Sequence, residues 1–170
     1  MKKLLVAYLT IMLFSCTPVQ SQDKDIDIVN TNTLTFKKLS TGSTICLSAS
    51  AASVTTAFGS PVSSTKVVSE MDDLTYTKCA YNGMTIYFES GKLTYIDITT
   101  TSIGLVFNNV TIKVGSDINN LSSLFPGSFA LRSDDQMLKV GLHHNGQVTD
   151  ALIVIGFNLH DKITYISLVN

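Results

Sequence analysis

Apolar residues recur with the same spacing in two segments of the chain, residues 44–61 and 111–128. In the first segment Leu47, Val54 and Phe58 lie seven and four positions apart, which places them on one face of a short helix. Glycine and proline close both segments and predict that each helix ends there. The pattern therefore predicts two short amphipathic helices, the second carried by Val114, Leu121 and Phe125.

A run of β-strands is expected after each predicted helix. Asn82-Gly83 and Asn145-Gly146 separate alternating apolar and polar runs, and Asn-Gly is a strong hairpin signal because both residues tolerate positive φ. Further on, the pattern Lys-x-Thr-Tyr-Ile occurs at Lys92–Ile96 and again at Lys162–Ile166. Because the same landmarks come twice in the same order, the sequence predicts a duplicated unit.

The predicted fold class is α+β, with two tandem helix-plus-antiparallel-sheet repeats at residues 34–104 and 105–170. In this prediction the helices pack on one face of a concave antiparallel sheet. Alternation turns isoleucine and phenylalanine side chains towards the helices and leaves the opposite face open, with Leu93 and Ile163 on that open side. The residues predicted to bind a partner on the open face are Tyr76, Lys78, Tyr87, Tyr95, Asp97, Lys139, His143 and Tyr165.

The N-terminus has the pattern of an exported lipoprotein. A basic start and a short apolar run before Ser15 are typical of a signal peptide, here residues 1–15. The sequence Leu-Phe-Ser-Cys that ends at Cys16 resembles the lipobox of bacterial lipoproteins, which implies lipid attachment at Cys16. Residues 16–33 are polar and predict a flexible tether. No aspartate follows Cys16, which favours the bacterial outer membrane, with the domain facing the periplasm or the cell surface.

Two segments resemble a known family of envelope proteins. ICLSASAASVTTAFGSP at residues 45–61 and IKVGSDINNLSSLFPGS at residues 112–128 each precede a hairpin-rich set of strands. In this respect the chain is similar to the SmpA/OmlA outer-membrane assembly lipoproteins and the β-lactamase inhibitor protein. The resemblance implies tandem helix-and-sheet units, function through protein binding, and no catalysis. It does not imply a β-lactamase as the partner, because no interface residue of the inhibitor can be matched here.

Composition and motifs exclude several functions. The chain of 170 residues has a formal net charge of −1 and a single arginine, Arg132, so nucleic-acid binding is not expected. His143 and His144 are adjacent on a predicted strand and point to opposite faces, so no metal site is expected. The sequence contains no phosphate-binding loop, nucleophile elbow or zinc-protease motif, and we expect neither an enzyme nor a cofactor. For Cys46 and Cys79 two alternatives stay open, a disulfide and two separate thiols.

These features predict a lipid-anchored, non-catalytic module that binds another envelope protein or a peptide on the open sheet face. Tyrosine is enriched at binding hot spots, although it is also common on antiparallel sheets for structural reasons. The alternative hypothesis is a lipoprotein that binds a small ligand or glycan in the cleft between the repeats. The oligomeric state does not follow from the sequence.

Overall fold

The fold was analysed in a computed structural model, which describes residues 25–69, 73–132 and 135–169. The predicted signal peptide, Cys16 and residues 17–24 lie outside the described residues. Within the described part of the chain, no helix is long and apolar enough to cross a membrane. The lipid anchor at Cys16 therefore stays a prediction from the sequence.

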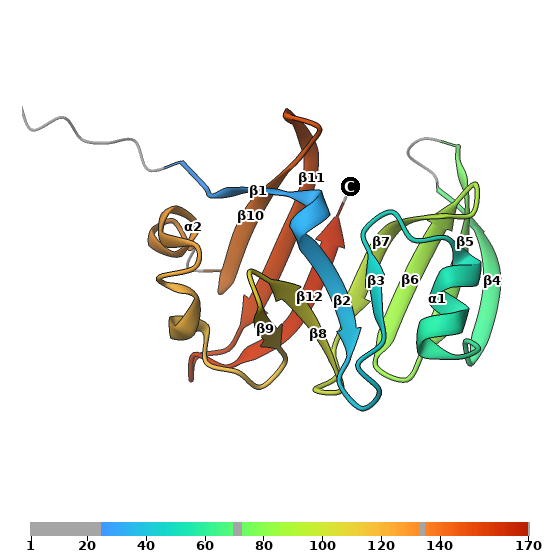
Figure 1. Cartoon of the computed structure of the whole chain (residues 1–170), viewed down its shortest axis with the longest axis horizontal. Coiled ribbons are helices and arrows are strands. Elements are labelled where there is room, and N and C mark those ends of the chain that lie inside the picture. The colour runs from blue at the N-terminus through green and yellow to red at the C-terminus, as the bar shows by residue number, and fades with distance from the viewer. Residues whose placement is uncertain (1–24, 70–72, 133–134, 170) are drawn as a thin grey trace, which may run out of the picture.

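The larger of the two sheets has eight strands, in the order β1-β10-β11-β12-β7-β6-β5-β4 (Figure 1). The strand β1 runs parallel to its neighbour β10, and the other neighbouring strands of this sheet are antiparallel. The strands of this sheet are β1 (Ile28–Asn30), β4 (Ser63–Val68), β5 (Thr75–Tyr81), β6 (Met84–Glu89), β7 (Lys92–Ile98), β10 (Met137–His144), β11 (Gln147–Phe157) and β12 (Ile163–Val169).

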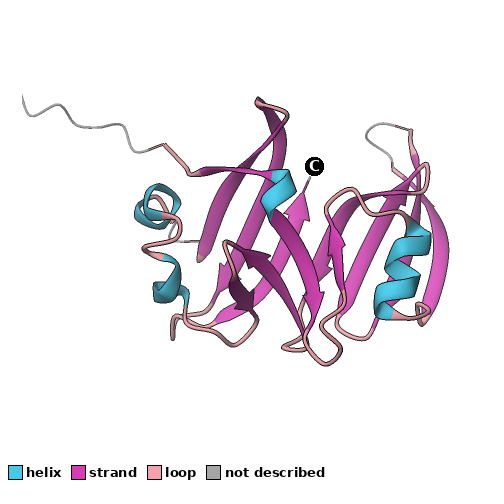
Figure 2. Cartoon of the chain, viewed as in Figure 1, coloured by secondary structure: helices cyan, strands magenta, loops and turns pink. Residues whose placement is uncertain are grey.

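A smaller sheet of four strands has the order β3-β2-β8-β9. Its strands are β2 (Leu34–Lys38), β3 (Thr44–Cys46), β8 (Ile103–Phe107) and β9 (Val110–Lys113). In the part of the chain that the structure describes, helical segments are short, as Figure 2 shows. They are the α-helices α1 (Ala51–Phe58) and α2 (Pro126–Ala130) and the 3₁₀ turns η1 (Thr31–Thr33) and η2 (Ile118–Leu121).

The predicted fold class is wrong. The described structure is mostly β, with 54% strand and 14% helix, and it has two sheets instead of two helix-plus-sheet repeats. One expected helix forms as α1, capped at its N-terminus by the Ser50 hydroxyl, which accepts a bond from the Ser53 amide. The second expected helix is divided into η2 and α2, because Pro126 begins a new helix at its first turn.

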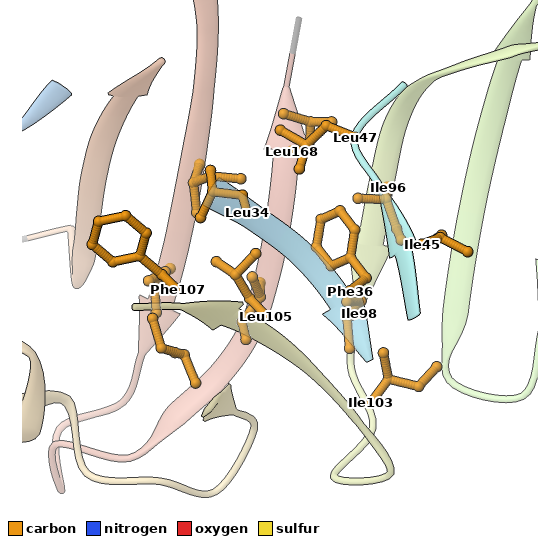
Figure 3. Packing of buried hydrophobic residues seen from close by; sticks show 14 of the residues in the cluster. Leu34, Phe36, Ile45, Leu47, Ile96, Ile98, Ile103, Leu105, Phe107 and Leu168 are labelled. Atoms are coloured by element: carbon orange, nitrogen blue, oxygen red, sulfur yellow. The ribbon is translucent and has the colours of Figure 1, made fainter. Parts of the chain in front are cut away.

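The smaller sheet supplies what the prediction assigned to helices, a cover for the inner face of the larger sheet (Figure 1). Its strands β2 and β8 pair with each other at the centre of the molecule, and the side chains that they turn inwards are buried. Phe36 and Leu105 are fully buried and belong to one core with Ile96 and Ile98 of β7, as Figure 3 shows. The alternating apolar runs over residues 34–38 and 103–107 were missed at the sequence level.

The two occurrences of the Lys-x-Thr-Tyr-Ile pattern lie in β7 and β12, which are neighbours at the centre of the larger sheet. They pair antiparallel, so that Asp97 stands directly opposite Ser167. A β-bulge interrupts the pairing of each strand with its other neighbour. In β7 it lies opposite Tyr87 and Phe88 of β6, and in β12 it lies opposite Gly156 and Phe157 of β11. The recurring threonine is the extra residue of each bulge.

Because of the bulges, the predicted alternation is wrong for Leu93 and Ile163. Leu93 is 6% exposed and Ile163 is 1% exposed, so both point into the core, whereas strict alternation placed them on the open face. An extra residue in a strand reverses the side to which the preceding side chains point. The tyrosines that follow the bulges remain on the outer side, which we call the outer face: the side of the larger sheet away from the smaller one.

The described part of the predicted tether, residues 25–33, is structured. Ile28–Asn30 forms β1 at the edge of the larger sheet, followed by η1. Asp27 and Ser128 bind one another twice: the Asp27 amide donates to the Ser128 hydroxyl at 2.9 Å, and the Ser128 amide donates to the Asp27 carboxylate at 2.7 Å. The proposed boundary between residues 104 and 105 falls inside β8, and both sheets combine strands from both halves of the chain.

Candidate binding face of the larger sheet

Three of the predicted site residues form one row across the outer face. Lys78 on β5 is the cross-strand neighbour of Tyr87 on β6, and Tyr87 is the neighbour of Tyr95 on β7. The two tyrosine rings meet edge to face, with centroids 5.3 Å apart and planes at 85°. The Lys78 ammonium lies 5.6 Å from the centroid of the Tyr87 ring, within reach of a cation–π interaction. Side chains of all three are partly exposed.

Asp97 continues this cluster towards the second half of the sheet. The Ser167 hydroxyl donates a hydrogen bond of 2.6 Å to the Asp97 carboxylate across the β7–β12 pair. Ser167 is 4% exposed, so this bond satisfies a buried hydroxyl. Burial raises the pKa of the Tyr95 hydroxyl, and the nearby Asp97 carboxylate raises it further, although a hydrogen bond with Ser167 acts in the opposite direction. Tyr95 is therefore a neutral hydrogen-bonding group at physiological pH.

Tyr165 behaves differently from Tyr95. It is the cross-strand neighbour of Gly156, and its ring lies where a side chain at Gly156 would be. The ring thus covers the bare backbone of a glycine in the middle of a strand, a place where glycine otherwise weakens the sheet. Tyr165 has a structural use on this face that the sequence did not reveal.

The remaining predicted residues lie towards the two ends of the sheet. Tyr76 is on β5, between Val67 of β4 and Glu89 of β6. Lys139 and His143 are on β10, separated from β5 by four strands, or about 24 Å at the usual strand spacing. In the described residues, the His143 Nδ1 is a buried atom without a hydrogen-bond partner. The structure therefore groups Lys78, Tyr87, Tyr95 and Asp97 and leaves Lys139 and His143 apart from them.

Cys46 and Cys79 are free thiols in the structure, so it does not contain the disulfide of the first alternative. Cys46 is exposed on β3 of the smaller sheet, whereas Cys79 is buried on β5 of the larger one. The Cys79 thiol contacts the Ser64 hydroxyl at 3.6 Å. Among the described residues, no group of three or more histidine, cysteine or acidic side chains could hold a metal ion.

A cleft does open between the two halves, on the inner side of the larger sheet. Its volume is about 280 Å³, just below the ~300 Å³ at which ligand pockets commonly begin. Buried leucines form part of its lining, and no tyrosine, phenylalanine or tryptophan lines it to pack against a sugar ring. The cleft therefore favours neither ligand of the alternative hypothesis, and the outer face is the better candidate site. The lining residues are Thr31, Asn32, Cys46, Leu47, Ser48, Lys92, Leu93, Thr94, Leu142, His144, Thr149, Ala151 and Leu168.

Sequence reasoning missed two residues that organise the outer face, Ser167 and Gly156. A signal for Ser167 was present: it stands at the same place after its Lys-x-Thr-Tyr-Ile pattern as Asp97 does after the first. Corresponding positions of two central antiparallel strands can lie opposite one another, which brings a hydroxyl to a carboxylate. Gly156 offered no signal beyond being a glycine inside an apolar strand, which indicates a bulge or a close approach.

The chain was compared with protein-family models, with curated proteins and with solved structures. No family model matched, and neither of the other two comparisons gave a significant match. The resemblance to the SmpA/OmlA lipoproteins and the β-lactamase inhibitor protein therefore stays a prediction.

Proposed function

We propose that the protein is a lipid-anchored, non-catalytic binding module of the bacterial outer membrane. It binds another envelope protein, or an extended peptide, on the outer face of its larger sheet. The anchor rests on the lipobox that ends at Cys16. Residues 17–24 and the structured segment that follows them would link the lipid to the edge of the larger sheet, where β1 pairs with β10.

One observation carries the proposal: the row Lys78, Tyr87 and Tyr95 on a partly exposed sheet face. Ile86 of β6 and Ile96 of β7, which these strands turn inwards, are fully buried. The outward tyrosines are held by each other and by Lys78, so a partner would meet rings whose orientation is already set. Preordered aromatic side chains lose little entropy on binding and are frequent at interface hot spots.

The charges of this face favour a partner that is polar at its margin. Lys78 contributes a positive charge beside the Tyr87 ring, and Asp97 lies on the other side of Tyr95 with its carboxylate bound to Ser167. An exposed lysine at a rim contributes mainly to the rate of association and to specificity. The tyrosine rings, which would be covered, are expected to contribute most of the affinity.

Site-specific photo-crosslinking in intact cells tests the proposal. A photoreactive phenylalanine derivative replaces Tyr87 or Tyr95 in the full chain, and the matched control replaces Thr111, an exposed residue of the smaller sheet. We expect one discrete adduct with an envelope protein from both tyrosine positions and none from Thr111. With the identified partner purified, Tyr95→Ala should lower its affinity by about tenfold or more, as for a hot-spot residue.

Two results would contradict the proposal. The first is an identical adduct pattern from Thr111 and from the tyrosine positions, since that would reflect proximity and not a specific face. The second is an unchanged affinity in Tyr95→Ala and Tyr87→Ala variants that retain the circular dichroism spectrum and unfolding midpoint of the parent chain. Lys78→Glu should change mainly the rate of association. Its charge control is Lys139→Glu, on the same face but four strands away.

A further inference from the structure

The strand β4 is a free edge of the larger sheet. It pairs on one side with β5 and is the last strand in the order, and every one of its six residues is exposed. At the other edge β1 has only three residues, and the edge strands of the smaller sheet, β3 and β9, have three and four. A long free edge presents unpaired backbone groups to any extended chain. Among the described strands, β4 is therefore the best edge for adding a strand.

The hydrogen-bond phase of β4 shows which backbone groups are available. The Ser69 amide donates to the Leu74 carbonyl and the Ser69 carbonyl accepts from the Asp73 amide, so Ser69 occupies a hydrogen-bonded pair position at the end of the β4–β5 ladder. In an antiparallel ladder such pairs alternate, so Thr65 and Val67 also turn their backbone groups towards β5. Ser64, Lys66 and Val68 consequently direct their amide and carbonyl groups away from the sheet.

The side chains of this edge are self-complementary. Val62 and Val68 are 82% and 63% exposed, and they stand three residues before and three residues after Thr65. If two copies of β4 pair antiparallel with Thr65 opposite Thr65, Val68 of each copy lies level with Val62 of the other, the residue directly before the strand. Lys66 then lies opposite a serine. The neighbouring register, centred on Lys66, would instead set two lysines against each other and cost stability.

We propose that two copies of this chain associate through β4, antiparallel and centred on Thr65, to form one continuous sheet of both molecules. The twofold axis passes between the two Thr65 residues, and the pairing is closed because both copies use the same edge. The backbone groups of Ser64, Lys66 and Val68 in each copy make the new ladder. The exposed Val68 at the end of each strand becomes covered.

This register also aligns the two candidate binding rows. Thr65 is the cross-strand neighbour of Lys78, which begins the row that leads to Tyr87 and Tyr95. With Thr65 on the axis, the row of one copy continues directly into the row of the other. The two Lys78 residues are then about three strand spacings apart, roughly 14 Å, a separation at which their repulsion is largely screened by salt. The association stands on the edge geometry and does not depend on the proposed binding partner.

Disulfide crosslinking of the full chain in its membrane tests this register. Thr65 would form a non-hydrogen-bonded pair with its counterpart, with Cα atoms about 4.5 Å apart, within the range for a disulfide. Thr65→Cys is therefore expected to give a covalent dimer after mild oxidation. The matched control is Ser63→Cys, on the same strand and face, whose two copies would lie about 13 Å apart. The parent chain measures the background from Cys46 and Cys79.

A second pair of variants separates strand addition from random collision. Lys66→Pro in the Thr65→Cys chain removes an outward amide without removing a bond to β5, and proline is tolerated at such edge positions. Lys66→Ala keeps the amide. We expect the dimer yield of Thr65→Cys to exceed that of Ser63→Cys by about tenfold and to be lost with Lys66→Pro but kept with Lys66→Ala. Equal yields from Thr65→Cys and Ser63→Cys, crosslinks to a different protein alone, or no dimer in a folded Thr65→Cys chain would each overturn the proposal.

Discussion

Two tyrosines on the outer face, Tyr95 and Tyr165, occupy corresponding places in the two halves of the larger sheet. In both, a tyrosine follows the bulge threonine of a Lys-x-Thr-Tyr-Ile strand and faces the neighbouring strand. In the first half Tyr95 meets Tyr87, and the rings stand edge to face at 5.3 Å. In the second half Tyr165 meets Gly156, and its ring lies over the glycine. The strand pattern is the same, but the residue across the strand differs.

The residue across the strand, and not the repeated pattern, therefore decides what a surface tyrosine does. The rings of Tyr87 and Tyr95 pack against each other and are both partly exposed, so a partner can contact them. A ring beside glycine can lie on the backbone and protect the sheet instead. We therefore expect the first half of the outer face to bind a partner, and Tyr165 to act mainly on stability.

Gly156→Ala should destabilise the second half most strongly. The added Cβ would overlap ring atoms of Tyr165, so the ring must leave its place on the sheet. Overpacking of this kind typically costs about 1–3 kcal/mol of unfolding free energy. Urea unfolding of the purified protein measures the loss. In the double variant Gly156→Ala with Tyr165→Ala the clash is absent, so the two effects should be clearly non-additive. Additive effects would show that the ring does not lie over the glycine.

Removing the Ser167 hydroxyl should have an intermediate effect. Ser167→Ala leaves the Asp97 carboxylate without its 2.6 Å hydrogen bond and is expected to cost about 1 kcal/mol in the same assay. Ser167→Asp should cost more at pH 7, because two carboxylates would then face each other across the central strands. Protonation of one of them relieves the repulsion, so the extra cost should disappear as the pH falls through the acidic range. An equal cost at pH 7 and pH 4 would contradict this account.

Alkaline pH should give the smallest effect, located in the first half of the outer face. The pKa of Tyr95 is raised above its ordinary value of 10.0, chiefly by burial and then by Asp97. A raised folded-state pKa means that this contribution to stability is complete below pH 10 and is lost as the pH rises through the folded pKa. The unfolding midpoint should therefore fall above pH 10, and Tyr95→Phe should reduce that fall. Tyr81, whose pKa is raised by burial as well, will retain its own part of the dependence. An identical pH profile for the parent and Tyr95→Phe would contradict the prediction.

Sequence reasoning was reliable where the signal is local. The Asn145-Gly146 hairpin forms with φ of 50° and 81° at the two residues, the region that asparagine and glycine tolerate. Val54 and Phe58 lie on the buried side of α1, as their spacing indicated. The grouping of Lys78, Tyr87 and Tyr95 on one face followed from alternation within strands. Each of these depends on the conformation of a few consecutive residues.

The assignment of a cover for the core failed because it depends on distant segments. Residues 34–38 and 103–107 alternate correctly for strands, but nothing local says that β2 and β8 pair with one another into a second sheet. The helical spacing around Leu121 and Phe125 likewise did not reveal that Pro126 would start a separate helix. Bulges were equally hidden, because the sides taken by Leu93 and Ile163 depend on the strand paired with each.

Local sequence patterns alone determine the Asn145-Gly146 hairpin, the helix α1, the inward position of Ile96 and Ile98, and the recurrence of the pattern at Lys92–Ile96 and Lys162–Ile166. The tertiary structure alone decided that these two strands are partners, that Asp97 meets Ser167, and that one tyrosine faces a tyrosine and the other a glycine. Side-chain period is a property of consecutive residues, whereas pairing is a choice among distant segments that only the packing of the whole core resolves.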